Sequence, residues 1–271
     1  MAMVEKRQRK ARSDAGQVRQ TARDALVLHW LCQMYGAPLD LIQEALQIGR
    51  PRAYQLADRW KRAGWIDKAV VDPGPVWLYP RKHVVEQYLE WSPAAWVPKV
   101  TTSAHVRAVA AVRLHETRLN GLAGPGDAME LEHWISERQL AHEQGYAKKG
   151  QPQQHTPDGV LILPSGERVL IEVELTAKSI ERYQQKLADI RIRADQLQCA
   201  HVAYYCKPGE VHRVVSGQVA ERRKERERKV FEQSRGIGDG GLPGPMWHVK
   251  SLEEVKGWQL ELPRPDRPEG R

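Results

Sequence analysis

The sequence predicts an α/β chain built from two successive parts, and three observations lead to this expectation. Apolar residues recur at helical spacing through the first third of the chain, which then ends in a short β-hairpin pattern. In the remainder, strand-like apolar runs alternate with amphipathic helical segments, which favours a mixed sheet. With 271 residues, 41% of them hydrophobic, the chain is long enough for two domains with real cores.

The composition shifts along the chain suggest where these parts begin and end. Pro93 and Pro98 lie among tryptophans and mark a short, stiff connection. Basic residues without an apolar core open the chain, and a Pro-rich segment closes it. We therefore expect a basic disordered arm at 1–21, a first domain at 22–92, a linker at 93–100, an α/β domain at 101–262 and a disordered tail at 263–271.

The first domain reads as helix, helix, short turn, basic helix and hairpin. Its first helix runs to Gly36, its second lies in LDLIQEALQ, and its third follows the turn before Pro51. Two short β segments then flank the Asp72–Pro75 turn. This order is that of a winged helix-turn-helix, in which the third helix enters the DNA major groove.

Basic residues on the third helix and near the hairpin give this domain its expected partner, double-stranded DNA. The chain as a whole carries a formal net charge of +8, which favours a polyanion. A winged helix used only for protein–protein contact is the alternative. The candidate DNA-binding residues are Arg50, Arg52, Tyr54, Gln55, Arg59, Lys61, Arg62, Lys68, Arg81 and Lys82.

The second domain reads α-β-β-β-α-β, followed by further helix and strand. Residues 105–122 form the opening helix, and residues 129–145 form a strand that runs into a polar loop. A hairpin follows within residues 155–179. The long helix after it has an expected inward stripe of Ile180, Tyr183, Leu187, Ile190 and Leu197.

Three carboxylates interrupt this hairpin. On a strand with period two, Glu172 and Glu174 share one face with Leu170. Folding the hairpin at Ser165–Gly166 brings Asp158 within about one residue of lying opposite Glu172. The three acids together predict a site for Mg²⁺ or Mn²⁺, which prefer oxygen ligands and bridge to phosphates.

The arrangement Pro157-Asp158 … Glu172-x-Glu174 resembles the PD-(D/E)xK superfamily, whose members share a restriction-endonuclease-like core. The resemblance implies that Asp158 and Glu172 bind the metal and that Glu137 is an auxiliary acid from the preceding strand. Glu174 stands where the family has its lysine, and Lys178 could supply a migrated amine. The implied catalytic residues are therefore Asp158, Glu172, Glu174, Lys178 and Glu137, with Asp158, Glu172 and Glu174 as metal ligands.

The order of motifs along the chain is also similar to the replication-relaxation family of plasmids and mobile elements. Members join a winged helix to a domain with W-x-S-E-R, then PD, then E-V-(D/E), then T-x-x-S. The matching segments are Trp134–Arg138, Pro157–Asp158, Glu172–Glu174 and Thr176–Ser179. This likeness covers roughly residues 25–205 and implies a role in plasmid replication, DNA relaxation or transfer.

Other function classes find little support. No run of apolar residues is long enough to cross a membrane. Three cysteines without paired spacing favour neither a disulfide framework nor zinc, and fit a cytoplasmic protein. The basic segment 221–229 alternates in sign, as solvated helices do, and the glycine-rich segment 236–241 is expected to be a flexible loop. Among the histidines, His155 lies beside the acids and is the one most worth testing.

Two functional hypotheses remain open. In the first, the chain is a DNA-binding protein of a mobile element that acts on DNA as a Mg²⁺-dependent or Mn²⁺-dependent endonuclease. In the second, it is a regulator without chemistry, whose second domain forms a homodimer or binds a partner. The carboxylates are correspondingly a metal site, the remnant of one, or the wet face of an amphipathic strand.

Overall fold

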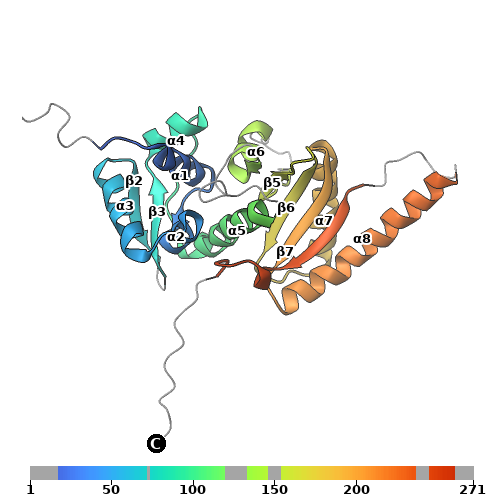
Figure 1. Ribbon diagram of the computed structural model, residues 1–271. Helices are drawn as coiled ribbons and strands as arrows, with labels where there is room; N and C mark the ends of the chain where they lie inside the picture. The colour runs from blue at the N-terminus through green and yellow to red at the C-terminus, as the bar shows by residue number, and fades with distance from the viewer. Residues whose placement is uncertain (1–17, 72–73, 120–132, 146–153, 236–243, 260–271) are drawn as a thin grey trace, which may run out of the picture.

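The computed structural model describes residues 18–71, 74–119, 133–145, 154–235 and 244–259. Within these residues the protein is a mixed α/β structure with eight α-helices, one three-stranded sheet and one five-stranded sheet (Figure 1). The expected mixed α/β class is confirmed. The predicted disordered arm, except for residues 18–21, and the predicted tail lie outside the described residues, as do the turn residues 72–73 and the segment 236–243.

The N-terminal unit packs four helices on a small antiparallel sheet of order β1-β3-β2. Thr21 begins the first helix with a capping box, in which Thr21 and Asp24 satisfy each other's backbone N–H groups. Gly49 and Pro51 begin the third helix, as expected. The elements are α1 (Ala22–Gln33), β1 (Ala37–Pro38), α2 (Leu39–Leu46), α3 (Arg50–Arg62), β2 (Ile66–Val70), β3 (Val76–Pro80) and α4 (Lys82–Leu89).

The second part is built around a five-stranded sheet of order β4-β5-β6-β7-β8. The pairs β4–β5 and β5–β6 are antiparallel, whereas β6, β7 and β8 run parallel and are joined by helical crossovers. The elements are α5 (Val100–Leu119), β4 (Trp134–Ser136), α6 (Glu137–Gln144), β5 (Gly159–Ile162), β6 (Arg168–Glu174), α7 (Ile180–Gln196), β7 (Cys199–Cys206), α8 (Glu210–Ser234) and β8 (Met246–Ser251), followed by a 3₁₀ turn (Leu252–Glu254).

The two faces of this sheet bury different helices. Leu170 of β6 belongs to a core formed with α7 and α8. Ile171 and Val173, which point the other way, belong to a core that also contains residues of α1, α2, α3 and α5. Alternation along β6 therefore places one helical layer on each side of the sheet. Because α5 lies between the sheet and the N-terminal unit, a single core continues across both (Figure 1).

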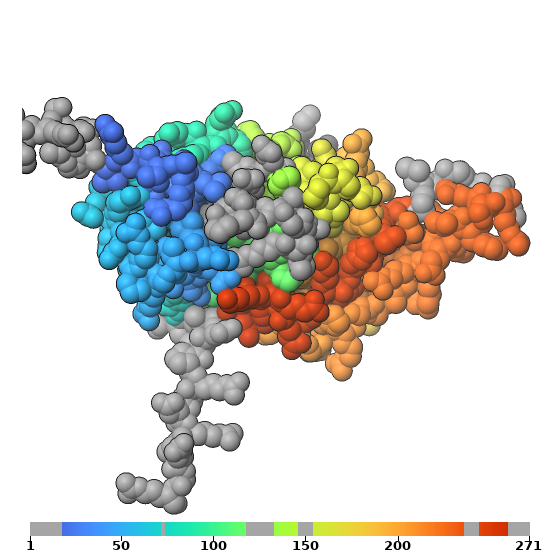
Figure 2. Space-filling view, in the orientation of Figure 1, coloured from blue at the N-terminus to red at the C-terminus, as the bar shows by residue number. Residues whose placement is uncertain are grey.

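Further contacts join the N-terminal unit to the second part. In the predicted linker, Trp96 lies against the rings of Tyr35 and Trp77, with ring centroids 5.9 and 6.0 Å apart. Arg138 of α6 donates to the backbone oxygens of Cys32 and Ala94. The segment after β8 also lies against the N-terminal unit, as the space-filling view shows (Figure 2). Lys256 of this segment forms an ion pair with Glu44 of α2, at 2.7 Å.

Several local expectations need correction. Ser136 caps a helix, since its hydroxyl accepts from the backbone N–H of Gln139, so the segment after β4 is α6 and not a polar loop. Ile180, the first residue of α7, is 53% exposed, whereas Tyr183, Leu187 and Ile190 are buried as expected and Leu197 is partly buried. In the described residues no helix has the length and apolar character needed to cross a membrane.

Candidate functional site

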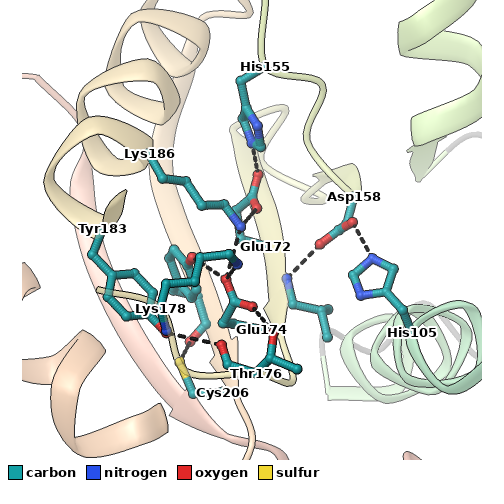
Figure 3. A network of polar contacts seen from close by, with 12 residues as sticks. His105, His155, Asp158, Glu172, Glu174, Thr176, Lys178, Tyr183, Lys186 and Cys206 are labelled. Carbon is teal, nitrogen blue, oxygen red and sulfur yellow. Dashed lines mark hydrogen bonds and ion pairs between the residues drawn. The ribbon is translucent and has the colours of Figure 1, made fainter. Parts of the chain in front are cut away.

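The register of β5 and β6 places Asp158 opposite Glu172, as the hairpin geometry predicted. Gly159 pairs with Ile171, so the residue before Gly159 faces the residue after Ile171. The chain reverses through Gly166, whose φ of +84° suits glycine. The backbone positions of the two acids are therefore adjacent, but their carboxylates take different partners (Figure 3).

Asp158 immediately precedes β5, and this position decides the direction of its side chain. Beyond the Gly159–Ile171 pair β5 offers no further partner to β6. The backbone N–H of Val173 donates instead to Oδ2 of Asp158, at 2.6 Å. Its Oδ1 lies 2.8 Å from Nε2 of His105, on α5. The carboxylate thus accepts from the N–H of β6 at the end of the β5–β6 ladder and faces α5, away from Glu172.

Glu172 and Glu174 point to the opposite side, towards α7. Lys186 places its Nζ 3.0 Å from Oε2 of Glu172 and 3.3 Å from Oε2 of Glu174. His155 bonds to Oε1 of Glu172 through Nε2. Both glutamates are almost fully buried, at 1% and 4% exposure. Without these cations, two such carboxylates would be very costly to desolvate.

Glu174 has further partners at the end of β6. Lys178 contacts its Oε2, and the hydroxyl of Tyr204 donates to the same oxygen at 3.3 Å. Thr176 donates to Oε1 at 3.4 Å. Lys178 therefore does reach the cluster, as expected for a migrated amine, but Lys186 occupies the central position between the two glutamates. We call Glu172, Glu174, Lys178 and Lys186 the acid–lysine cluster.

Glu137 lies on the other side, with Asp158 and His105. It is the first residue of α6 rather than a strand residue, because Ser136 begins the helix. A small cavity there is lined by Tyr35, His105, Glu137 and Asp158, and it lies between the N-terminal unit and the second part. The five predicted catalytic residues are thus divided between two neighbouring clusters on either side of β6.

The charges of these clusters are reflected in their pKa values. Burial raises the pKa of Glu137 to about 7, and the nearby charge of Asp158 adds to this. Burial alone would lower the pKa of His105, but the charge of Asp158 and the hydrogen bond to it raise the value above 6.5. Burial likewise opposes the charge on Lys186, yet Glu172 and Glu174 raise its pKa. Each cluster therefore holds carboxylate and cation together.

The three predicted metal ligands do not surround one point. Asp158 is turned towards His105, and the ammonium of Lys186 occupies the space between Glu172 and Glu174. Among the described residues, no group of three or more His, Cys, Asp or Glu side chains is placed to hold a metal ion. As arranged, the donor set does not fit a single Mg²⁺ or Mn²⁺ bound by all three carboxylates.

Sequence reasoning missed Lys186, His105 and Tyr204. Lys186 precedes Leu187, which is buried, and lies near the middle of α7, the helix that begins six residues after Glu174. A search for lysines beside the buried positions of that helix would have found Lys186. His105 had no such signal, because α5 and β5 are far apart in the sequence and are brought together only by the fold.

The exposed side of α3 carries five of the ten predicted DNA-binding residues. Ala53, Leu56, Ala57 and Trp60 bury the opposite side. None of the four basic residues on the exposed side forms an ion pair with a described carboxylate. The exposed residues are Arg50, Arg52, Gln55, Lys61 and Arg62.

The other five predicted residues have partners within the protein. Arg59 forms an ion pair with Asp24, which is fully buried and also accepts from Nε1 of Trp60 at 2.9 Å. Tyr54 is half-buried against the core. The remaining ion pairs are Lys68 with Asp58, Arg81 with Asp67 and Lys82 with Glu86.

Comparison with known proteins gave no match, whether to a protein-family model, to a curated protein or to a solved structure. The two features that bear on function are the basic side of α3 and the paired clusters beside β6.

Proposed function

We propose that the protein binds double-stranded DNA through α3. The observation that carries the proposal is a set of four exposed basic residues on this helix, none of which forms an ion pair with a described carboxylate: Arg50, Arg52, Lys61 and Arg62. Asp58 of the same helix attracts Lys61 and Arg62, but its ion pair is with Lys68. Like charges so arranged repel one another, and DNA phosphates would neutralise them with release of counterions. Gln55 lies on the same side and suits hydrogen bonding to a base edge.

The neighbouring elements support this proposal. α2 and α3 are joined by residues 47–49, a turn of the length typical of helix-turn-helix motifs, with Gly49 in it. The strands β2 and β3 follow α3 as an antiparallel hairpin. The order α1-β1-α2-α3-β2-β3 is the winged helix-turn-helix order, in which α3 would enter the major groove and the hairpin would lie beside the backbone.

Titration of labelled duplex DNA tests the proposal. Arg52→Ala and Arg62→Ala should weaken binding and reduce the slope of log K against log salt concentration by about 0.9 for each phosphate that the variant no longer neutralises. Lys224→Ala, on α8, removes an exposed positive charge away from α3 and serves as the control (Figure 1). Equal affinity and equal salt slopes for all four proteins would exclude α3 as the DNA-binding element.

The order of short motifs supports a more specific role in replication, relaxation or transfer of a mobile element. W-I-S-E-R covers β4 and the start of α6, P-D precedes β5, and E-V-E ends β6. T-x-x-S then leads to Ser179, whose hydroxyl caps α7. All four segments therefore lie at one end of the hairpin, around the two clusters, where a common function would place them.

Hydrolysis of the DNA backbone is the second candidate function. Asp158 opposite Glu172, with Lys186 beside Glu172, supplies the acids and the amine of a PD-(D/E)xK-like, restriction-endonuclease-like site. The side chains as placed do not hold one metal between all three carboxylates, so no catalytic step is derived through Mg²⁺ or Mn²⁺. A nicking assay on supercoiled DNA with and without these ions decides the matter.

In that assay, Asp158→Ala and Glu172→Ala should abolish nicking while duplex affinity persists. If the wild-type protein is as inert as both variants with either ion, the chain is a regulator without chemistry. Its second part would then form a homodimer or bind a partner, and the clusters would serve stability alone.

A further inference from the structure

A polar groove runs along the flank of α7 and reaches the acid–lysine cluster. It has a volume of about 320 Å³ and lies between α7 and the segment before β5. His155 lines it and also bonds to Glu172, which connects the groove directly to the cluster. Lys186, Asp189, Arg193 and Gln196 follow one another at spacings of three and four residues, so they share one side of α7.

The groups along this groove can bind phosphate and base edges. Arg193 donates from Nη1 to Gln196 and has no ion pair with a described carboxylate, while its Nε is buried and not accessible from the groove. A guanidinium without a carboxylate partner can attract a phosphate through its charge and its remaining Nη hydrogens. The amides of Gln154, Gln185 and Gln196 offer donors and acceptors of the kind that recognise bases.

Asp189 and Ile192 indicate which class of ligand the groove can bind. Asp189 accepts from Gln185 at 2.9 Å and has no ion pair with a described cation, so its carboxylate can accept from the amino group of a base. Ile192 is 56% exposed at the groove and offers an apolar surface for a base or sugar. A site for inorganic phosphate alone would need neither feature.

We infer that this groove binds a single nucleic-acid strand and leads it to the acid–lysine cluster. Its volume is near the lower end of the range for small-ligand sites, roughly 300–1,000 Å³, so it admits about one or two nucleotides and excludes a duplex. Unstacked bases on a single strand expose the edges that glutamine and aspartate side chains contact. DNA and RNA strands share this chemistry.

The inference rests on the proposed nucleic-acid function but assigns a different surface from α3. Fluorescence anisotropy with labelled single strands of about 12 nucleotides, of DNA and of RNA, and with the matching DNA duplex, tests it in the presence of EDTA. The variants are Arg193→Ala and the double variant Gln185→Ala/Gln196→Ala, with Lys224→Ala as the matched surface control. A photo-crosslinking amino acid placed at Ile192 adds a readout that does not depend on affinity.

Arg193→Ala should weaken binding of at least one type of single strand ~10-fold or more, the loss expected for a hydrogen-bonded charge pair. Its duplex affinity should equal that of Lys224→Ala, and the probe at Ile192 should crosslink the single strand. The inference is overturned if single-strand affinity is unchanged, if duplex and single strand weaken equally, or if the probe crosslinks neither strand type.

The two proposals can fail separately. If Arg52→Ala and Arg62→Ala weaken duplex binding while Arg193→Ala leaves the single strand unaffected, the groove assignment falls and α3 keeps its role. If Arg193→Ala weakens single-strand binding while the α3 variants leave the duplex unaffected, the groove is supported and the proposal for α3 falls.

Discussion

Lys186 holds its ammonium 3.0 Å from a carboxylate oxygen of Glu172, and both groups lie largely out of solvent. Removing the cation would leave Glu172 and Glu174 buried with fewer partners. Lys186→Met should therefore lower the free energy of unfolding by about 3–5 kcal/mol, the usual cost of breaking a buried ion pair from one side. Urea denaturation followed by circular dichroism measures the change.

Two comparisons make this prediction specific. Lys178→Met should have the smaller effect, because the side chain of Lys178 is 31% exposed and contacts Glu174 alone among the carboxylates. Adding Glu174→Gln to Lys186→Met should recover part of the lost stability, since it removes one of the unpaired charges. A Lys186→Met protein as stable as the wild type would show that the cluster is hydrated and not held by Lys186.

Arg59 was predicted to contact DNA, but its ion pair with Asp24 predicts a structural role. Arg59→Ala would leave the carboxylate of Asp24, which is 0% exposed, with Nε1 of Trp60, the backbone N–H of Thr21 and, at 3.6 Å, the guanidinium of Arg23 as its described partners. We expect a loss of about 1–3 kcal/mol in the free energy of unfolding. Arg52→Ala should show the opposite behaviour, with unchanged stability and weaker DNA binding. Thermal melts and duplex titrations on both variants distinguish the two roles.

The sequence predicted the backbone of the candidate site better than its side chains. Alternation and the turn at Ser165–Gly166 were enough to place Asp158 opposite Glu172, because strand register follows from local geometry. The direction of the Asp158 carboxylate was not predictable in this way. It depends on where β5 stops pairing and on His105, which comes from a distant helix.

The roles of helix residues also depend on partners from other elements, which the sequence alone does not reveal. The basic residues of α3 could be counted from the sequence, but which of them are free to contact DNA depends on Asp24, Asp58 and Asp67, contributed by other elements. Glu137 was assigned to a strand because the PD-(D/E)xK resemblance implies an auxiliary acid there. The hydroxyl of Ser136 and its bond to the N–H of Gln139 start a helix there instead.

Gly159 is required by the ring of Trp134 on the neighbouring strand. A Cβ at residue 159 would lie 2.3 Å from Cζ2 and 2.6 Å from Cε2 of that ring, which is closer than packed atoms can approach. Gly159→Ala should therefore displace β4 from β5 and cost about 1–3 kcal/mol. Gly217, in α8, has no atom within 4 Å of the corresponding position, so Gly217→Ala should instead stabilise by about 0.5–1 kcal/mol. Equal melting temperatures for the two variants would contradict this explanation.

The raised pKa of Glu137 predicts a dependence of stability on pH. Its pKa in the folded protein is about 7, against an ordinary value of 4.5. Below pH 4.5 both states hold the proton, and this group has no effect. Between pH 4.5 and 7 the unfolded state releases its proton first, so the free energy of unfolding falls as pH rises, and above pH 7 the loss is constant.

Glu137→Gln should remove this loss of unfolding free energy, and it also removes one of the charges that raise the pKa of His105. The pKa values of His105 and His155 are also raised, so their stabilising contributions are lost as pH rises through the folded-state values in both proteins. The melting temperature of the variant minus that of the wild type should therefore increase from pH 4.5 to 7 and then level off. Each kcal/mol corresponds to roughly 2–4 °C for a chain of about this size. A difference that stays constant over this range would mean that Glu137 titrates at its ordinary pKa and is hydrated in the folded protein.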